Sequence, residues 1–277
     1  MKKIYLIGGL ILGYALAEPY IQRIKKYKIV SNQIPPNFHN YKIAFLADIH
    51  YGRTINAKSL TKIVNRVNNW NPDLIILGGD YVMMREHIYP CFKILSTLKS
   101  KQGIYAVIGN HDVMESLHDT RNAMHKYNIK SINNAAYWIE KGDQRIKLGG
   151  VGDLRTQRQL IEPTVSDTTI NDYIILVTHN PRYIYQLKEE YDISLVLAGH
   201  THGGQISALK YLGKIVPPVI DQAAAFTYLS GKTNKNAQDV IVSNGIGTAK
   251  FPIRILTWPE TIFITLKSEN INQNGNT

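Results

Sequence analysis

Histidine, aspartate and asparagine residues recur at the ends of short apolar runs in this chain of 277 residues. Each of these side chains offers a nitrogen or an oxygen that can bind a divalent metal ion. In chain order, the candidate metal ligands are Asp48, His50, Asp80, Asn110, His179, His200 and His202. A lone histidine is usually an ordinary surface or core residue, but such a set at successive strand ends is not a collection of independent accidents. The pattern therefore predicts a metal centre.

The spacing within these motifs favours ligands that share an ion. Residues two apart in extended backbone point the same way, so Asp48 and His50 can face one ligand. The same holds for His200 and His202, which stand between glycines. Two glycines before Asp80 allow close backbone approach beside a carboxylate that could bridge two cations.

A third motif adds groups that titrate. In Gly109-Asn110-His111-Asp112, the glycine permits a turn and the asparagine offers a neutral oxygen ligand. The histidine offers an imidazole, and the aspartate could hold that imidazole in one orientation. The motif thus combines a metal ligand with a candidate acid or base.

Strands and helices must alternate to position these residues. Strands that end in polar residues are predicted at 42–48, 74–80, 103–109, 173–179 and 195–200. Helices are predicted at 57–70, 89–98 and 116–127, and a hairpin at 138–150. In open α/β sheets, ligands bind beyond the carboxyl ends of the strands, so one face should collect all the candidate ligands.

The ordered motifs resemble those of the calcineurin-like metallophosphoesterase superfamily. They are Asp48-x-His50, Gly78-Gly79-Asp80, Gly109 to Asp112, Thr178 to Pro181 and Gly199 to Gln205, within residues 42–207. Glu18-Pro19, Asn244 to Gly247 and Pro252 to Arg254 resemble more narrowly its bacterial membrane-associated branch. That branch includes YaeI- and YkuE-like phosphoesterases and is related to enzymes that cleave UDP-2,3-diacylglucosamine.

The resemblance implies an α/β fold, a four-layer α/β/β/α sandwich of two mixed β-sheets flanked by helices. The catalytic domain is expected over residues 31–267. A hydrophobic membrane segment with a basic flank is expected over residues 1–30, and a disordered tail over residues 268–277.

The resemblance also implies a hydrolase with two divalent ions. One ion would be held by Asp48, His50, Asp80 and His202, and the other by Asp80, Asn110, His179 and His200. Nitrogen and oxygen ligands without thiolate suit Mn, Fe or Zn. Hydroxide between the ions would attack phosphorus in line. His111, held by Asp112, would stabilise the phosphoryl oxygen or protonate the leaving group.

Charge bears on the substrate. Lys and Arg number 32 against 21 Asp and Glu, a net charge of +11, which favours anionic partners, although solubility alone is the plainer explanation. Candidate substrate-binding residues are Arg53, Arg155 and Arg254. We expect a phosphodiester or pyrophosphate of a lipid or nucleotide-linked lipid, such as a UDP-diacylglucosamine.

Two other functions stay open. One is a metallonuclease or nucleotide phosphodiesterase, and the other is a non-catalytic metal-binding adaptor. Nucleic acid is not the expected partner, because no basic stretch is interleaved with aromatic residues. The single cysteine excludes an internal disulfide, and the sequence leaves the oligomeric state open.

The amino-terminal sequence bears on whether the protein associates with a membrane. Its apolar run, residues 4–17, spans about 21 Å as a helix against a hydrocarbon core of about 30 Å. An uncleaved anchor, a signal peptide cleaved after Ala17 and a buried helix are the alternatives. Basic residues after the run oppose translocation. We expect a protein associated with the cell membrane, its catalytic domain on the cytoplasmic side, with the extracytoplasmic side left open.

Overall fold

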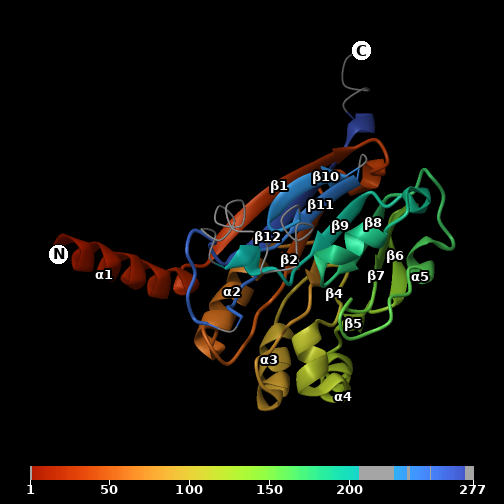
Figure 1. The fold of residues 1–277 in the computed structure, drawn as a ribbon. Helices are drawn as coiled ribbons and strands as arrows, with labels where there is room; N and C mark the ends of the chain where they lie inside the picture. Colours follow the sequence, from red (N-terminus) through yellow and green to blue (C-terminus); the bar gives the residue numbers. More distant parts are fainter. Residues whose placement is uncertain (1, 206–227, 236–237, 250, 272–277) are drawn as a thin grey trace.

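Two six-stranded β-sheets lie face to face, with helices outside them (Figure 1). The computed structural model describes residues 2–205, 228–235, 238–249 and 251–271. The first sheet, in spatial order, contains β1 (Arg23–Ser31), β12 (Glu260–Ser268), β2 (Lys42–Leu46), β3 (Leu74–Leu77), β4 (Ile104–Ala106) and β5 (Lys130–Ser131). The second contains β10 (Gly231–Lys235), β11 (Gln238–Val242), β9 (Leu195–Ala198), β8 (Ile174–Thr178), β7 (Gln144–Gly150) and β6 (Ala135–Lys141).

Both sheets mix parallel and antiparallel neighbours. In the first, only β12 and β2 pair antiparallel, whereas in the second both outermost pairs, β10 with β11 and β6 with β7, are antiparallel. The other pairs of the second sheet are parallel. The central parallel strands of each sheet carry the functional loops at their carboxyl ends, as the alternating sequence pattern predicted.

The alternation of side chains along the strands builds three apolar layers. In β2, Ile43 and Phe45 face the second sheet, whereas Ala44 and Leu46 face the helices. Strand β8 likewise directs its residues alternately to the inter-sheet layer and to the outer face of the second sheet. Because both faces of each sheet are covered, the central strands read as unbroken apolar runs. The predicted sandwich of two mixed sheets flanked by helices is confirmed.

Three helices cover the outer face of the first sheet: α2 (Ala57–Trp70), α3 (Ile88–Leu95) and α4 (Asn110–Lys126). The Asn56 side chain accepts a hydrogen bond from the Ser59 amide and begins α2, which has its predicted bounds. Helix α4 begins six residues before the predicted start. The backbone of Ser116 is non-helical, which interrupts the periodicity of α4 and hides its first turn in the sequence.

The amino-terminal segment belongs partly to the domain. Helix α1 (Lys2–Ala17) projects from the body, but the following strand β1 pairs in parallel with β12 along its whole length (Figure 1). The basic residues predicted as a membrane flank therefore lie in an edge strand of the first sheet. The domain boundary expected at residue 31 is corrected accordingly, because β1 completes the sheet.

The predicted membrane association is contradicted. Among the residues that the structure describes, no helix combines the length and the apolar character needed to cross a bilayer. Helix α1 has 16 residues and spans about 24 Å, short of a hydrocarbon core of about 30 Å.

The carboxyl terminus is ordered further than expected. Ser268 ends β12 and is buried, and Glu269–Ile271 form a single 3-10 turn. The rest of the predicted disordered tail, residues 272–277, lies outside the described residues, as do residues 206–207 at the end of the motif region.

Candidate metal centre

Loops from both sheets bring the predicted ligands to one place. Asp48 and His50 follow β2, Asp80 follows β3, and Asn110 opens α4 after β4. From the second sheet, His179 follows β8, and His200 and His202 follow β9. Two groups of ligand atoms, from Asp48, His50 and His202 and from Asp80, His179 and His200, each lie within 4.8 Å of one another. A further group of His50, Asp80 and His111 overlaps both. The carboxyl ends of the parallel strands therefore converge as predicted.

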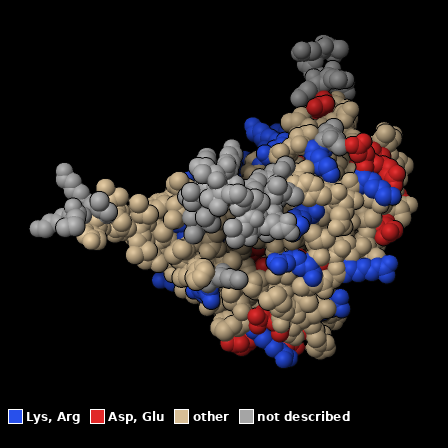
Figure 2. Space-filling view, in the orientation of Figure 1, with Lys and Arg blue, Asp and Glu red and all other residues tan. Residues whose placement is uncertain are grey.

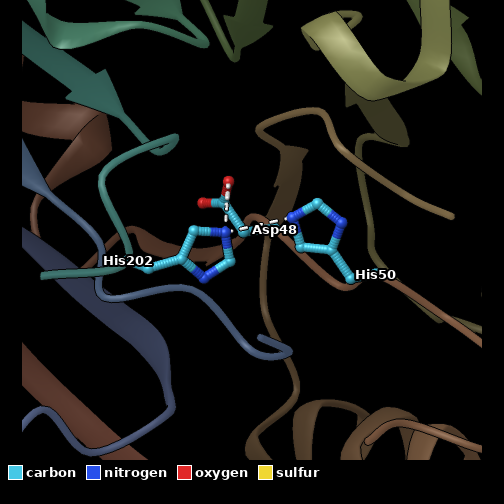
Figure 3. Close-up of side chains that lie close together, drawn as sticks. All are labelled: Asp48, His50 and His202. Carbon is cyan, nitrogen blue, oxygen red and sulfur yellow. Dashed lines mark hydrogen bonds and ion pairs between the residues drawn. The ribbon is translucent and has the colours of Figure 1, made fainter. Parts of the chain in front are cut away.

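The first group joins Asp48, His50 and His202 (Figure 3). The Nε2 atoms of His50 and His202 lie 3.0 Å apart, and His202 Nε2 lies 3.7 Å from Asp48 Oδ1. All three residues are buried. Two imidazole nitrogens and a carboxylate oxygen thus face one point, which is the donor set of a divalent transition-metal site.

Asp80 links this group to the next. Its Oδ2 atom lies 3.6 Å from His50 Nε2 and 3.3 Å from His179 Nε2. Its Oδ1 atom accepts a hydrogen bond of 2.8 Å from the His111 amide. One oxygen is therefore held by the backbone, while the other faces histidines from both sheets. This arrangement suits a bridging ligand.

The second group contains Asp80, His179 and His200. His200 Nδ1 lies 3.2 Å from His179 Nε2. The His179 Nδ1 atom lies 2.8 Å from the Gly78 carbonyl oxygen, which can only accept, so Nδ1 is the donor. Nε2 of His179 is thereby directed to the site, because a metal-binding histidine usually donates its other ring N–H to a nearby acceptor that fixes the ring.

Asn110 contributes a buried oxygen. Asn110 is buried, at 7% exposure, yet its Oδ1 atom has no hydrogen-bond partner among the described residues. An unpaired buried acceptor costs roughly 1–3 kcal/mol, so such groups are rare without a ligand. The orphaned oxygen and the histidine and aspartate groups together fit divalent metal ions.

Burial sets the protonation of the centre. It lowers the pKa of His50 to about 4 and the pKa of His200 to about 3, so both imidazoles stay neutral and able to bind metal. Burial alone would raise the pKa of Asp80 and lower that of His179. The attraction between the two reverses both shifts, lowering the pKa of Asp80 and raising that of His179 to about 10. The buried Asp80 carboxylate thus requires a nearby positive charge.

The backbone at the centre is strained. Five predicted ligands adopt left-handed conformations, with φ of 53° at Asp48, 44° at His50, 56° at Asp80, 70° at His200 and 51° at His202. Such conformations cost of order 1–3 kcal/mol each in residues with a side chain and cluster at functional sites. Packing of the surrounding fold maintains these conformations, and this packing holds the metal-donor atoms in place.

The motif glycines give room to the ligands themselves. A Cβ atom on Gly109 would lie 2.2 Å from Asp80 Oδ1, and one on Gly199 would lie 2.5 Å from Asp48 Oδ2. Because glycine has no Cβ atom, the Asp80 and Asp48 carboxylates can lie directly against the backbone at these positions.

His111 and Asp112 take different positions from those predicted. The half-buried His111 ring meets the His50 ring edge-on, with 4.9 Å between ring centroids. Asp112 is fully buried, and its carboxylate accepts from the amides of Asp80, Tyr81 and Gly109 at 2.8–2.9 Å. No described hydrogen bond joins Asp112 to the His111 ring. The prediction that Asp112 orients His111 is corrected: Asp112 holds the Asp80 loop and caps α4.

The three candidate substrate-binding arginines lie in three different environments. Arg155 lines a hollow beside His200. Arg53 is exposed, and its Nη1 atom donates to the Ala249 carbonyl at 3.1 Å. Arg254 is completely buried, so its predicted contact with substrate is corrected.

Arg254 instead joins the loops behind the centre. Its guanidinium donates to the backbone carbonyls of His202, Asn244, Gly245, Gly247 and Thr257 at 2.5–3.4 Å. One guanidinium nitrogen also lies 3.3 Å from the Nδ1 atom of His202. Arg254 is thus a positioning residue for a predicted ligand.

Glu18 supports Arg254 from the amino terminus. Its buried carboxylate accepts from the amides of Leu256 and Thr257 at 2.8 and 2.6 Å, and the Arg254 amide donates to Ala15 at 3.0 Å. Sequence reasoning linked Glu18 only to the resemblance. Its place directly after an apolar helix offered no signal of this contact, which joins residues more than 230 positions apart.

Replacing Arg254 by lysine is expected to weaken metal binding by about 10–100-fold. An ammonium has three donors and cannot reproduce the planar fork, so several buried carbonyls lose their partners. We also expect a loss of about 2–4 kcal/mol of unfolding free energy. Calorimetric titration with Mn²⁺ and thermal unfolding measure the two effects. Arg66→Lys, on the exposed surface, is the control, and unchanged Mn²⁺ affinity in Arg254→Lys would contradict the positioning role.

Comparison with known proteins agrees with this geometry. The family model described as calcineurin-like phosphoesterase matches residues 41–204, which include all the predicted ligands. The metallophosphoesterase YkuE of Bacillus subtilis is 28% identical over 93% of this chain and 90% of its own. YpbG of the same organism is 32% identical over 81% of this chain and 80% of its own. The phosphodiesterase YaeI of Escherichia coli is 29% identical over 82% of each chain.

The matched segment covers more than half of the chain, and its motif residues are those that the fold brings together. The chain belongs to the calcineurin-like phosphoesterase family and is a metal-dependent phosphoesterase.

Proposed function

We propose that the protein hydrolyses a phosphodiester or pyrophosphate bond at a centre of two divalent metal ions. One observation carries the proposal: a single oxygen of Asp80 faces His50 from the first sheet and His179 from the second. Donors on both sides of one carboxylate suit a pair of ions. Asp48 and His202 would complete the first ligand set, and Asn110 and His200 the second.

Bound metal ions would acidify water and neutralise charge on the phosphoryl oxygens. The chain supplies the other groups. The His111 ring lies beside His50, is partly accessible, and has no hydrogen bond within the described residues. It can therefore donate a proton to a departing oxygen or a hydrogen bond to the phosphoryl group. Asp112 keeps the Asp80 loop in place by accepting from the amides of Asp80 and Tyr81.

For the substrate we propose a lipid phosphodiester or a nucleotide-linked lipid, such as a UDP-diacylglucosamine-like molecule. Two features support an anionic substrate with an apolar part. The net charge is +11, and Lys and Arg side chains border the hollow in the middle of the face drawn in Figure 2. Apolar side chains of α1, including Leu10 at 66% exposure, lie open on the surface.

Removal of metal is expected to abolish hydrolysis reversibly. The purified protein is treated with EDTA, dialysed, and assayed on bis-p-nitrophenyl phosphate with Mn²⁺, Fe²⁺ or Zn²⁺ restored. Activity should fall to the background rate and return with at least one of these ions, at about two ions per chain by elemental analysis. If the metal-loaded protein gives no turnover, the chain is a metal-binding adaptor and the proposed activity is wrong.

A substrate panel tests the finer proposal. Phospholipids, UDP-acylglucosamines and cyclic nucleotides are incubated with the Mn²⁺-loaded protein, and phosphate-containing products are followed by mass. We expect turnover of lipid-linked diesters or pyrophosphates. A preference for soluble nucleotides that detergent micelles leave unchanged would contradict the lipid component.

A further inference from the structure

A hollow of about 320 Å³ opens beside the metal centre. His200, a predicted ligand, forms part of its wall, and Arg155, Arg182, Tyr185 and Tyr228 form other parts. Neither Arg182 nor the two tyrosines belong to the motifs that hold metal. The hollow is therefore a separate subsite that shares one wall with the centre.

Two arginines give this subsite its positive charge. Arg155 and Arg182 are exposed, and within the described part of the chain neither side chain makes a hydrogen bond or ion pair. Among the described residues that line the hollow, none carries a carboxylate. Two guanidinium groups beside a metal centre form a site for a second anionic group.

Buried turns position both arginines. The Arg155 amide donates to the carboxylate of Asp153 at 3.0 Å, and Asp153 is fully buried. The Arg182 amide donates to the side-chain oxygen of Asn180 at 3.0 Å, and Asn180 directly follows the predicted ligand His179. The backbone on each side of the hollow is thus fixed, so the guanidinium groups start from set positions.

The tyrosines add an aromatic surface. Tyr185 is 45% exposed, whereas Tyr228 behind it is 6% exposed. Their ring centroids lie 5.2 Å apart with an angle of 62° between the planes. Tyr228 therefore supports the Tyr185 ring, while Tyr185 presents aromatic surface to solvent. An aromatic ring of a ligand can stack there.

We propose that this subsite binds the second phosphate and the base of a nucleoside diphosphate ester, a deepening that rests on the proposed function. The two phosphates of such an ester share one bridging oxygen. When one phosphorus lies at the metal centre, the other can reach Arg155 and Arg182, and the base can reach Tyr185. The subsite thereby distinguishes a pyrophosphate bond from a simple phosphodiester.

The reaction balances with water alone. An oxygen of water forms a bond to the phosphorus at the metal centre, and the bond from that phosphorus to the bridging oxygen breaks. The bridging oxygen leaves on the nucleotide held by the arginines. The products are a nucleoside monophosphate and the phosphate ester of the other group, and the two protons of water pass to these phosphates or to solvent.

The test compares UDP-glucose with bis-p-nitrophenyl phosphate. In Arg155→Gln/Arg182→Gln, kcat/KM for UDP-glucose should fall by about 10–100-fold, mainly through KM, because charge-assisted bonds to one phosphate are lost. The rate with bis-p-nitrophenyl phosphate should change less than about threefold. Tyr185→Ser should lower kcat/KM for UDP-glucose and leave the rate with bis-p-nitrophenyl phosphate unchanged. Arg121→Gln/Arg158→Gln, at exposed positions, is the matched control.

A binding measurement separates this proposal from the proposed function. UDP is titrated calorimetrically into the Mn²⁺-loaded protein and into the double arginine variant, and the variant should bind about 10–100-fold more weakly. If the double arginine variant binds UDP as tightly as the unchanged protein, or loses rate equally on both substrates, the proposed subsite is wrong. If bis-p-nitrophenyl phosphate is hydrolysed but UDP-glucose is not, the subsite is overturned while the phosphodiesterase function stands. If neither substrate reacts, the proposed activity fails, and UDP binding still decides the subsite.

Discussion

Asp80→Asn is expected to lower kcat/KM on bis-p-nitrophenyl phosphate by about 10³-fold or more, because one residue serves both ligand groups. The Asp80 carboxylate faces His50 and His179 through the same oxygen, so its charge acts on both sides of the centre. Asparagine has nearly the same shape and can still accept the hydrogen bond from the His111 amide. The substitution therefore removes charge while the loop keeps its backbone contact.

Elemental analysis should find that Asp80→Asn binds fewer metal ions per chain than the unchanged protein. Asp143→Asn makes the same substitution at an exposed hairpin turn, where the side chain accepts a hydrogen bond from Asn37, and should keep full activity and metal content. Circular dichroism of both variants shows whether the fold is intact. Wild-type activity and metal content in a folded Asp80→Asn protein would show that Asp80 does not bridge the two groups.

His111→Ala is expected to reduce turnover by about 10²–10⁴-fold and to leave metal content nearly unchanged. The structure poses a real alternative, since a His111 ring nitrogen lies within 4.8 Å of the ligand atoms of His50 and Asp80. If His111 were a ligand, the variant would lose metal together with activity. Parallel measurement of turnover and of bound Mn²⁺ decides between the two roles.

The leaving group distinguishes proton donation by His111 from oxyanion stabilisation. A p-nitrophenolate group leaves without a proton, whereas a nucleoside alkoxide needs one. Loss of a general acid therefore lowers the hydrolysis rate far more when the leaving group is an alkoxide. The His111→Ala defect should therefore be larger for thymidine 5′-monophosphate methyl ester than for bis-p-nitrophenyl phosphate. Equal defects would assign His111 to the phosphoryl oxygen. His118→Ala, on the exposed side of the same helix, serves as control.

Local patterns predicted much of the fold. The predicted bounds of α2 were right to the residue, because the stripe of Leu60, Ile63, Val64 and Val67 has helix periodicity, which is encoded within a few positions. The apolar runs that became β2, β3, β8 and β9 were equally visible, since strands buried on both faces are apolar throughout.

Two other elements were predicted wrongly. Strand β1 mixes basic and apolar residues without strict alternation at a sheet edge and was attributed to a membrane flank. Helix α4 was predicted to begin at Ser116, where the kink lies, and its first turn was missed. For β1 a tertiary contact outweighs the local pattern, because β12 pairs with it. For α4 the missed signal is local: the Asp112 carboxylate accepts from the Gly109 amide three residues earlier and caps the helix.

The sequence by itself determined which donor groups exist and that they stand where strands end, because residue type and strand direction are local properties. Only the tertiary structure decided which donors share a point, that Asp112 holds a loop rather than His111, and that Arg254 lies buried behind His202. Those relations join residues up to about 150 positions apart across two packed sheets. Their distances follow from how the sheets stack and from left-handed turns at Asp48 and Asp80, which the surrounding packing maintains.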